Sequence, residues 1–269
     1  MPKNKIWVKG CLVIFWLAWG AFQAGLISGE PGDQEQEAME NYLKTARVVK
    51  IIKGTTGGRT APWIVNLTDG QVQRRAVFKF VNRPRPAMLP DSYRYELAAY
   101  RLSRMLDLDF VPPLVERTID SRPGSLQLMI PGTMQENYRA SHGLEPPDRK
   151  SFDQALAEIL ILENLVYDEC LDGTDILIQK SNWKVWRIDF SEAFAPVEEL
   201  LPDCPIRSCS RNLYESLKKL DEGSVKSALQ SYLNEAELAA LLKRKELILN
   251  KIKELIEEQG EEAIIFIKK

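Results

Sequence analysis

Residues 166–194 read VYDECLDGTDILIQKSNWKVWRIDFSEAF, and this stretch decides how the rest of the chain is interpreted. The apolar run DILI and the run KVWRI are separated by a polar turn, a pattern typical of a β-hairpin. Five acidic residues precede Phe190, at both ends of this hairpin: Asp168, Glu169, Asp172, Asp175 and Asp189. Carboxylates placed in this way indicate either a metal and proton-transfer site or the remains of one.

The bulk composition is that of a globular protein. The chain has 269 residues, of which 45% are hydrophobic and 28% charged, which is enough for one large domain or two lobes with a core. The formal net charge is −2. Because binding to a phosphate backbone usually requires a strong basic excess, nucleic acid is not expected as a partner.

The N-terminus has the layout of an export signal. Three lysines precede an apolar run that begins at Cys11. Residues 1–29 are therefore expected to be a signal peptide or, since residues 10–29 approach the length that spans a bilayer, an uncleaved membrane anchor. Either alternative brings the N-terminus to the membrane at least transiently and places the rest of the chain in the periplasm or another extracytoplasmic space. Residues 30–40 are expected to form a polar linker.

Histidine and cysteine give little support to a zinc or histidine-based site. The only histidine, His142, lies in a polar stretch typical of a solvated loop. Structural zinc and Ser-His-Asp or Cys-His catalysis are therefore not expected. Cys204 and Cys209 bracket the segment CPIRSC and could close a small loop in an oxidising compartment, although the sequence does not fix this pairing.

The remaining chain divides into a sheet-rich part and a helical part. In the first, strand-like runs bounded by turn signals surround one long segment with helical periodicity. In the second, an apolar helix precedes the acidic hairpin, and the pattern beyond the hairpin is mostly helical. The expected fold is α+β, with a small β-rich N-lobe over residues 41–132 that carries one long helix, and a helical C-lobe over residues 133–269.

Four features occur in the order that phosphoryl transfer from ATP requires. Such a site needs a lysine for the phosphates, a helix carboxylate to position that lysine, and acidic groups for the metal. Lys79 lies mid-strand among apolar residues, Glu96 sits early in the following helix, and Asp189 follows the second hairpin strand. The segment GTTGGRT, with Gly54 and Gly57, lies between the first two strands, where a loop covering phosphates would lie. Their order and spacing together indicate a nucleotide site.

With these features the chain resembles a bacterial family of atypical kinase-like proteins, which is related to phosphatidylinositol 3-/4-kinases, HipA-type kinases and the secretory-pathway casein kinases. The resemblance covers Ala46 to Phe266. It rests on the segments AVFKF, YELAAYRLSRMLDLDFVPP, GSLQLMIPGTM, GLEPPD, WKVWRIDFSEAF and LLKRKELILNKIKELIEEQGEEAIIF. It implies a two-lobed protein-kinase-like fold that binds ATP with Mg²⁺ or Mn²⁺.

The resemblance also implies roles for individual residues. Lys79 and Glu96 would form the pair that positions the phosphates, and Asp189 would bind metal. The segment from Met129 to Gly132, which includes Ile130, would contact the adenine.

The catalytic loop departs from the pattern of these related kinases. Their loop resembles Asp-Arg-Asn-x-Gly-Asn, with the base first and a metal ligand last. Aligned on DILI, the last position falls on Asp175, which still offers oxygen to Mg²⁺ or Mn²⁺. The base falls on Cys170 and the arginine on Leu171, so both the carboxylate and its positive neighbour are lost. Asp168 or Asp172 could take the place of the base.

Two functions remain open at this point. In the first, the protein is an exported atypical kinase in which Asp175 and Asp189 bind the metal and Asp168 is the base. In the second, it is a catalytically inactive pseudokinase that acts as a binding or scaffold protein. No readable motif identifies the phosphate acceptor, which could be a protein or a small molecule.

Overall fold

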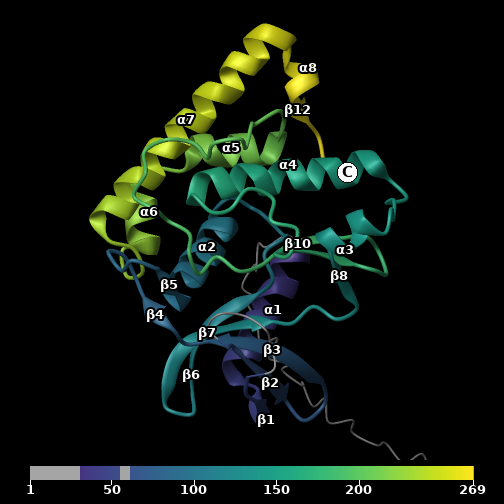
Figure 1. Ribbon diagram of the computed structural model, residues 1–269, viewed down its shortest axis with the longest axis vertical. Helices are drawn as coiled ribbons and strands as arrows, with labels where there is room; N and C mark the ends of the chain where they lie inside the picture. The colour runs from purple at the N-terminus through teal and green to yellow at the C-terminus, as the bar shows by residue number, and fades with distance from the viewer. Residues whose placement is uncertain (1–30, 55–60, 269) are drawn as a thin grey trace, which may run out of the picture.

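The computed structural model describes residues 31–54 and 61–268, in which a β-sheet at one end packs against a helical region at the other (Figure 1). This arrangement confirms the predicted α+β fold. The expected signal or anchor over residues 1–29 and the glycine at position 57 lie outside the described residues. No helix within the described ranges is both long enough and apolar enough to cross a bilayer.

A five-stranded antiparallel sheet with the order β1-β2-β3-β7-β6 forms the N-terminal region. Its strands are β1 (Arg47–Ile52), β2 (Trp63–Thr68), β3 (Gln73–Lys79), β6 (Leu114–Ile119) and β7 (Arg122–Leu128). The side chain of Asp69 closes the turn between β2 and β3, because its Oδ1 accepts the backbone N–H groups of Gln71 and Val72.

Side chains alternate between the two faces of this sheet. One face, which includes Val65, Ala76 and Phe78, is buried in a small core beneath the helix α1 (Pro31–Thr45). The opposite face carries Lys79, whose ammonium group contacts Asp189 in the helical half of the molecule. The sheet therefore has an outer face for stability and an inner face for the site.

The long helix α2 (Tyr93–Met105) lies between β3 and β6 in the sequence. It follows the short strands β4 (Asn82–Arg83) and β5 (Asp91–Ser92), and the Ser92 side chain caps it by accepting the N–H of Arg94. Its apolar residues pack into the main core, and Glu96 in its first turn is also buried. The cap thus fixes the start of the helix close to Glu96.

The helical region contains six helices among the described residues. These are α3 (Glu136–Ser141), α4 (Arg149–Val166), α5 (Arg211–Lys219), α6 (Glu222–Leu229), α7 (Glu235–Gln259) and α8 (Glu261–Ile264). The apolar face of α4 and the inner face of α7 share one core with α2. The strands β11 (Cys209–Ser210) and β12 (Ile265–Phe266) pair in parallel and fasten the C-terminal end to the segment before α5.

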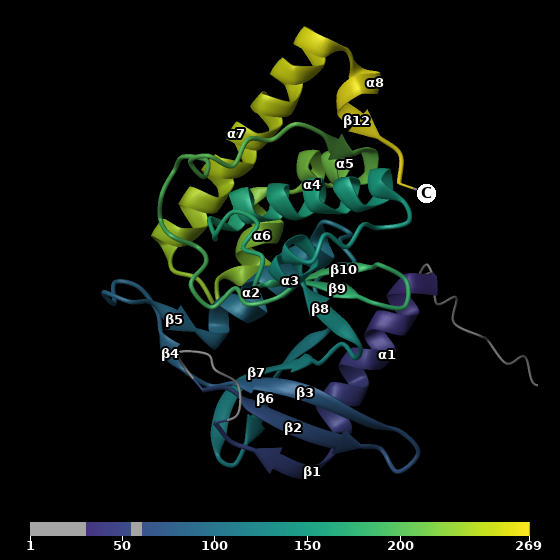
Figure 2. The ribbon, with the colours of Figure 1, turned by 45° about the vertical axis from the view of Figure 1, so that its right-hand side comes forward.

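The predicted acidic hairpin is confirmed. Its strands are β9 (Ile176–Gln179) and β10 (Val185–Arg187), and β8 (Thr133–Gln135) extends them to a three-stranded sheet. Figure 2 shows this small sheet between the large sheet and the helices. The hairpin thereby brings its carboxylates to the junction of the two regions.

The expected polar linker over residues 30–40 is wrong, because α1 occupies Pro31–Thr45. The helix packs along the large sheet (Figure 2). Leu43 is fully buried there, and the Arg117 guanidinium donates to the backbone oxygens of Leu43 and Ala46 at 2.7 and 2.8 Å. The polar composition of residues 30–40 suggested a linker. The residues that stabilise this segment as a helix lie far away in the sequence, so the local pattern does not reveal them.

Candidate active site

Lys79, the last residue of β3, is the cationic centre of the site. Its Nζ lies 2.5 Å from Oε1 of Glu96 on α2 and 2.7 Å from Oδ1 of Asp189, two residues after β10. The Glu96 side chain is buried, whereas 44% of the Asp189 side chain is exposed. The fold therefore brings together the three residues that were singled out by their order in the sequence.

Lys79 and Asp189 keep each other ionised, whereas burial raises the pKa of Glu96. Burial alone would lower the pKa of Lys79, but the charges of Glu96 and Asp189 outweigh burial and raise that pKa above its usual value. Burial alone would also raise the pKa of Asp189, but Lys79 overrides it and lowers that pKa to about 2. At neutral pH the site thus presents a lysine cation beside an aspartate anion.

The backbone and a neighbouring hydroxyl hold Asp189 in place. Asp189 has a φ of 64°, in the left-handed region that aspartate tolerates better than most residues. The Ser191 hydroxyl donates to Asp189 Oδ1 at 3.1 Å, and the Ser191 carbonyl accepts the N–H of Ser92 at the start of α2. The segment after the hairpin is therefore joined directly to the helix that carries Glu96.

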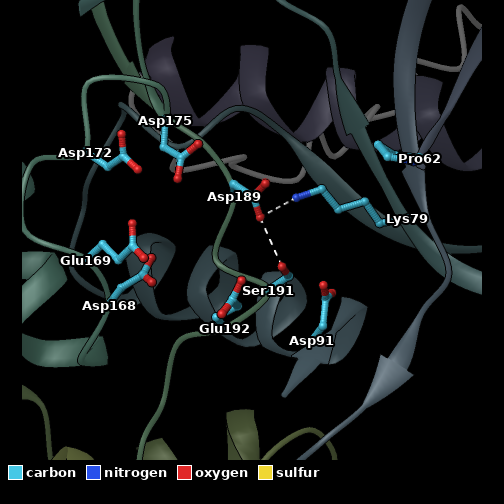
Figure 3. Close-up of a pocket in the computed structure, with 10 residues that line it drawn as sticks. All are labelled: Pro62, Lys79, Asp91, Asp168, Glu169, Asp172, Asp175, Asp189, Ser191 and Glu192. Carbon is cyan, nitrogen blue, oxygen red and sulfur yellow. Dashed lines mark hydrogen bonds and ion pairs between the residues drawn. The ribbon is translucent and has the colours of Figure 1, made fainter. Parts of the chain in front are cut away.

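Lys79 and Asp189 line a cavity of about 240 Å³ (Figure 3). Its lining residues are Pro62, Lys79, Asp91, Asp168, Glu169, Asp172, Asp175, Asp189, Ser191 and Glu192. Seven of these ten carry carboxyl groups and one carries a positive charge. A cavity with this excess of acidic groups suits cations, including a metal that accompanies a phosphate chain.

Arg187 in β10 organises the acidic loop from beneath. Its guanidinium is fully buried and lies 2.8 Å from Glu163 of α4, 2.8 Å from Asp168 and 3.6 Å from Asp175. Sequence reasoning missed both Arg187 and Glu163. The available signals were a charged residue inside the apolar helix segment ILILENLV and an arginine inside the buried strand VWR. Arg187 supplies a positive charge close to the place where the loop has leucine at position 171.

Asp168 and Asp175 are poised for proton exchange near neutral pH. Burial raises the pKa of Asp168 to about 7, although Arg187 opposes the shift. Burial also raises the pKa of Asp175 to about 7, with Arg187 again opposing and Asp189 adding to the rise. The structure thus brings both predicted residues to the Lys79 cavity, with Asp168 anchored by an arginine.

Asp172, the other candidate for the base, is engaged locally. Its Oδ1 accepts the N–H of Thr174 at 2.7 Å and the hydroxyl of the same residue at 2.9 Å. The Thr174 backbone bond lowers the pKa of Asp172, and the hydrogen bond with Asp172 raises the pKa of Glu169. A carboxylate that shapes the loop and has a lowered pKa is a weaker base than Asp168.

Cys170, the cysteine at the aligned base position, forms a disulfide with Cys204. The Cα atoms of Cys170 and Cys204 are 5.8 Å apart, and the bond joins the acidic loop to the segment before β11. Cys209 is a buried free thiol in β11. The considered Cys204–Cys209 pair is therefore corrected, since the parallel pairing with β12 holds Cys209 elsewhere.

Among the remaining predicted residues, those that the structure describes do not line this cavity. Gly54 is described and adopts a φ of 70°, and its partner in the glycine segment, Gly57, is outside the described residues. Ile130 is buried, and Met129 borders a separate cavity of about 380 Å³ next to Asn66. His142 is exposed after α3, as predicted.

The donor set suits a hard divalent cation. Asp175 and Asp189 line the same cavity, and each offers carboxylate oxygen, the ligand that Mg²⁺ and Mn²⁺ prefer. Asp189 is half exposed and already ionised through Lys79. The residues present therefore fit the metal that the sequence resemblance implied.

Solved structures with the same fold support the kinase-like architecture. A structure of Fam20 from hydra, solved with sugar, superposes with a TM-score of 0.64 at 16% identity, covering 87% of this chain and 93% of that chain. The proinflammatory kinase CtkA of Helicobacter pylori gives a TM-score of 0.51 at 10% identity, covering 82% and 98%. No protein-family model and no curated protein matches the sequence. The chain thus has a kinase-like fold.

Proposed function

We propose that the protein is an exported atypical kinase that binds ATP with Mg²⁺ or Mn²⁺ and transfers the γ-phosphate to an acceptor hydroxyl. The observation that carries the proposal is the position of Lys79, ion-paired with both Glu96 and Asp189 at one wall of an acidic cavity. In phosphoryl transfer the protein mainly positions and neutralises the phosphates, and this arrangement provides the groups for both tasks.

The protein's own residues have separate tasks in this proposal. Lys79 binds phosphate oxygens while Glu96 holds its ammonium group in place. Asp175 and Asp189 would hold the divalent ion, which when bound neutralises charge on the phosphate chain. The anchored carboxylate of Asp168 accepts the proton of the acceptor hydroxyl as the new O–P bond forms and the bond to the leaving ADP breaks.

The extracytoplasmic location is part of the proposal. The lysine-led apolar N-terminus supports it, and so does the Cys170–Cys204 disulfide, because such bonds persist mainly in oxidising compartments. Secretion of the protein fused to a reporter that is active only outside the cytoplasm tests this point. An inactive reporter would contradict the extracytoplasmic location, and activity that persists without residues 1–29 would contradict their role in export.

A second candidate function is a pseudokinase that binds nucleotide or a partner without turnover. The observation in its favour is the fate of the aligned base position, where Cys170 is locked in a disulfide. The nearest replacement, Asp168, is held by Arg187 at 2.8 Å. Both features fix the shape of the acidic loop, and a loop of fixed shape is sufficient for binding without turnover.

Nucleotide binding is tested first by a thermal-shift titration of the full chain with ATP and Mg²⁺ or Mn²⁺. A ligand at about 100 times its dissociation constant adds roughly 2.7 kcal/mol, which moves the midpoint of a domain of this size by about 5 °C or more. We expect this shift in the wild type and its loss in Asp189→Ala. No shift with either metal would contradict both candidate functions in their nucleotide-binding form.

Turnover separates the two candidates. With radiolabelled ATP and a panel of protein, sugar and small-molecule acceptors, the kinase predicts metal-dependent labelling that Asp168→Ala abolishes while ATP affinity stays nearly intact. The matched variant Asp172→Ala retains labelling if Asp168 is the base. Labelling that survives in Asp168→Ala would remove that residue from the role, and binding without any labelling would favour the pseudokinase.

A further inference from the structure

The side chain of Gln127 on β7 lies on the inner face of the sheet, two residues along the strand ladder from Lys79. In the antiparallel ladder Lys79 is opposite Ser125, and Val77 is opposite Gln127. Opposed residues share a face, so Gln127 and Lys79 point to the same side of the sheet. The two positions are offset by two residues, roughly 7 Å along the strands. This offset leads away from Lys79 toward Met129.

Gln127 carries a buried amide without a partner. Its side chain is 8% exposed, and its Nε2 has no hydrogen-bond partner among the described residues. On β2, Oδ1 of Asn66 is also buried and unpartnered within the same part of the chain, and Asn66 is opposite Arg75, which shares the inner face with Val77. Buried amides are almost always hydrogen-bonded in native proteins, so two on one face indicate a polar ligand.

The end of β7 and the connector after it, residues 129–132, use two of their backbone N–H groups within the protein. The N–H of Leu128 donates to the Pro113 oxygen at 2.8 Å, and that of Met129 donates to the Arg75 oxygen at 2.9 Å. Pro131 has no N–H. Backbone carbonyls of this connector can accept from an amino group, but an oxo group needs a donor. On the inner face of the sheet, Nε2 of Gln127 is a donor without a partner among the described residues.

We propose that Gln127 is a specificity-determining residue that contacts the 6-position of a purine base and lets the site accept a 6-oxo purine nucleotide as well as ATP. The inference rests on the proposed nucleotide function. An amide carries both a donor and an acceptor, so Nε2 donates to a 6-oxo oxygen and, after rotation, Oε1 accepts from the 6-amino group of adenine. With an apolar side chain at this position, only the connector carbonyls would be left to contact the purine 6-position. They can accept from the 6-amino group of adenine but offer no donor to a 6-oxo group.

Calorimetric titration of the full chain with ATP and with ITP, each with Mn²⁺, tests this inference. ITP differs from ATP at the purine 6-position and N1 and lacks the 2-amino group of GTP. We expect the wild type to bind the two nucleotides within about tenfold of one another. Gln127→Met should weaken ITP by about tenfold or more, because the oxo group loses its donor, and weaken ATP much less. This variant removes an unpartnered buried amide at similar volume, so it is expected to fold.

The control is Gln71→Met, the same substitution at an exposed turn position, which should leave both affinities unchanged. Binding of ATP without ITP to the wild type would overturn the role of Gln127 and leave the nucleotide function standing. An equal loss of both nucleotides in Gln127→Met would also overturn it. If neither nucleotide binds the wild type, the proposed function fails, and the inference fails with it.

Discussion

At the scale of single residues, Arg187 fixes the shape of the acidic loop through its ion pairs with Glu163 and Asp168. Its guanidinium joins α4 to the loop through Glu163 and Asp168, and both Arg187 and Glu163 are fully buried. Glu163 also accepts the N–H of Leu171 at 2.8 Å through its second oxygen. One ion pair thus controls side chains and backbone on both sides of the disulfide-bonded Cys170.

Arg187→Met is expected to lower stability strongly. The substitution leaves Glu163 as a buried charge without its cation, which typically costs about 3–5 kcal/mol. A chemical unfolding curve of the metal-free protein measures the loss. The double variant Arg187→Met with Glu163→Leu should recover much of it, because the buried charge is then absent. A single variant as stable as the wild type would show that the pair contributes little.

Single residues also show where sequence reasoning reaches its limit. Lys79, Glu96 and Asp189 were identifiable because their order along the chain matches their tasks, and the structure brings them together. Arg187 was not identified, because its partner Glu163 is 24 residues away and nothing in the local pattern indicates which acidic residue it meets. The same holds for the disulfide, since spacing alone favoured a neighbour of Cys204.

At the scale of elements, the loop between α4 and β9 is fixed by its connection to a distant segment. The disulfide joins residues separated by 34 positions, and Asn164 on α4 donates to the Cys204 carbonyl at 3.2 Å beside it. The acidic loop is therefore fastened at its middle and not only at its ends. Its carboxylates depend on this fastening for their positions.

Cys204→Ser should destabilise the protein by about 2–4 kcal/mol, because removing the cross-link increases the entropy of the unfolded chain. Thermal unfolding with and without a reducing agent measures this. The wild-type midpoint should fall on reduction, and the midpoint of the variant should not respond. A wild type that is insensitive to complete reduction would contradict the prediction.

The helix α1 is the element that the sequence pattern described least well. Most strands and the long helices were recognisable from period and turn signals, but α1 is polar on average and its apolar residues are few. Its stability comes from packing on the sheet and from Arg117 at its C-terminal end. Tertiary contacts of this kind outweigh local composition.

Leu43→Ala is expected to release α1 from the sheet. Leu43 is fully buried, and truncating such a leucine costs about 2–5 kcal/mol. The exposed residue Glu37 on the same helix provides the control, since Glu37→Ala should change stability little. Hydrogen exchange of the α1 amides, measured by mass spectrometry, should rise in the first variant alone. Equal exchange in both variants would mean that Leu43 does not hold the helix.

For the whole molecule, the order of strands and helices carries the kinase-like fold. Strand order β1-β2-β3-β7-β6, with α2 inserted after β3, places Lys79 and Glu96 side by side. The helical region then presents the acidic hairpin to them. The overall plan was predictable because it depends on the sequence of elements, whereas the cavity was not, because its shape depends on side chains from both regions. The boundary near residue 132 stays a prediction.

Stability should fall as pH rises through neutrality in the absence of divalent metal. The pKa values of Asp168 and Asp175 are raised by burial to about 7 in the folded protein, above their ordinary value of 3.8. The folded state therefore binds more protons than the unfolded state between these values, and the stability present below the unfolded pKa is lost as pH rises through 7.

Thermal unfolding in chelator between about pH 5 and pH 8 checks this direction. The midpoint should decrease across the range, and Asp175→Asn should reduce the slope, because one of the two groups no longer titrates. A midpoint that is constant or rises with pH would contradict the assignment of raised pKa values to these two carboxyl groups.

The docking of α1 also bears on how the molecule would be tethered. The helix starts at Pro31, and Leu43 and Arg117 fasten its C-terminal end to the sheet. If residues 10–29 stay in a bilayer, as one form of the proposal has it, α1 would tie the sheet and its cavity to the lipid surface. Under the proposed kinase function, acceptors that come to that surface would then be modified in preference to other hydroxyl groups in the surrounding space.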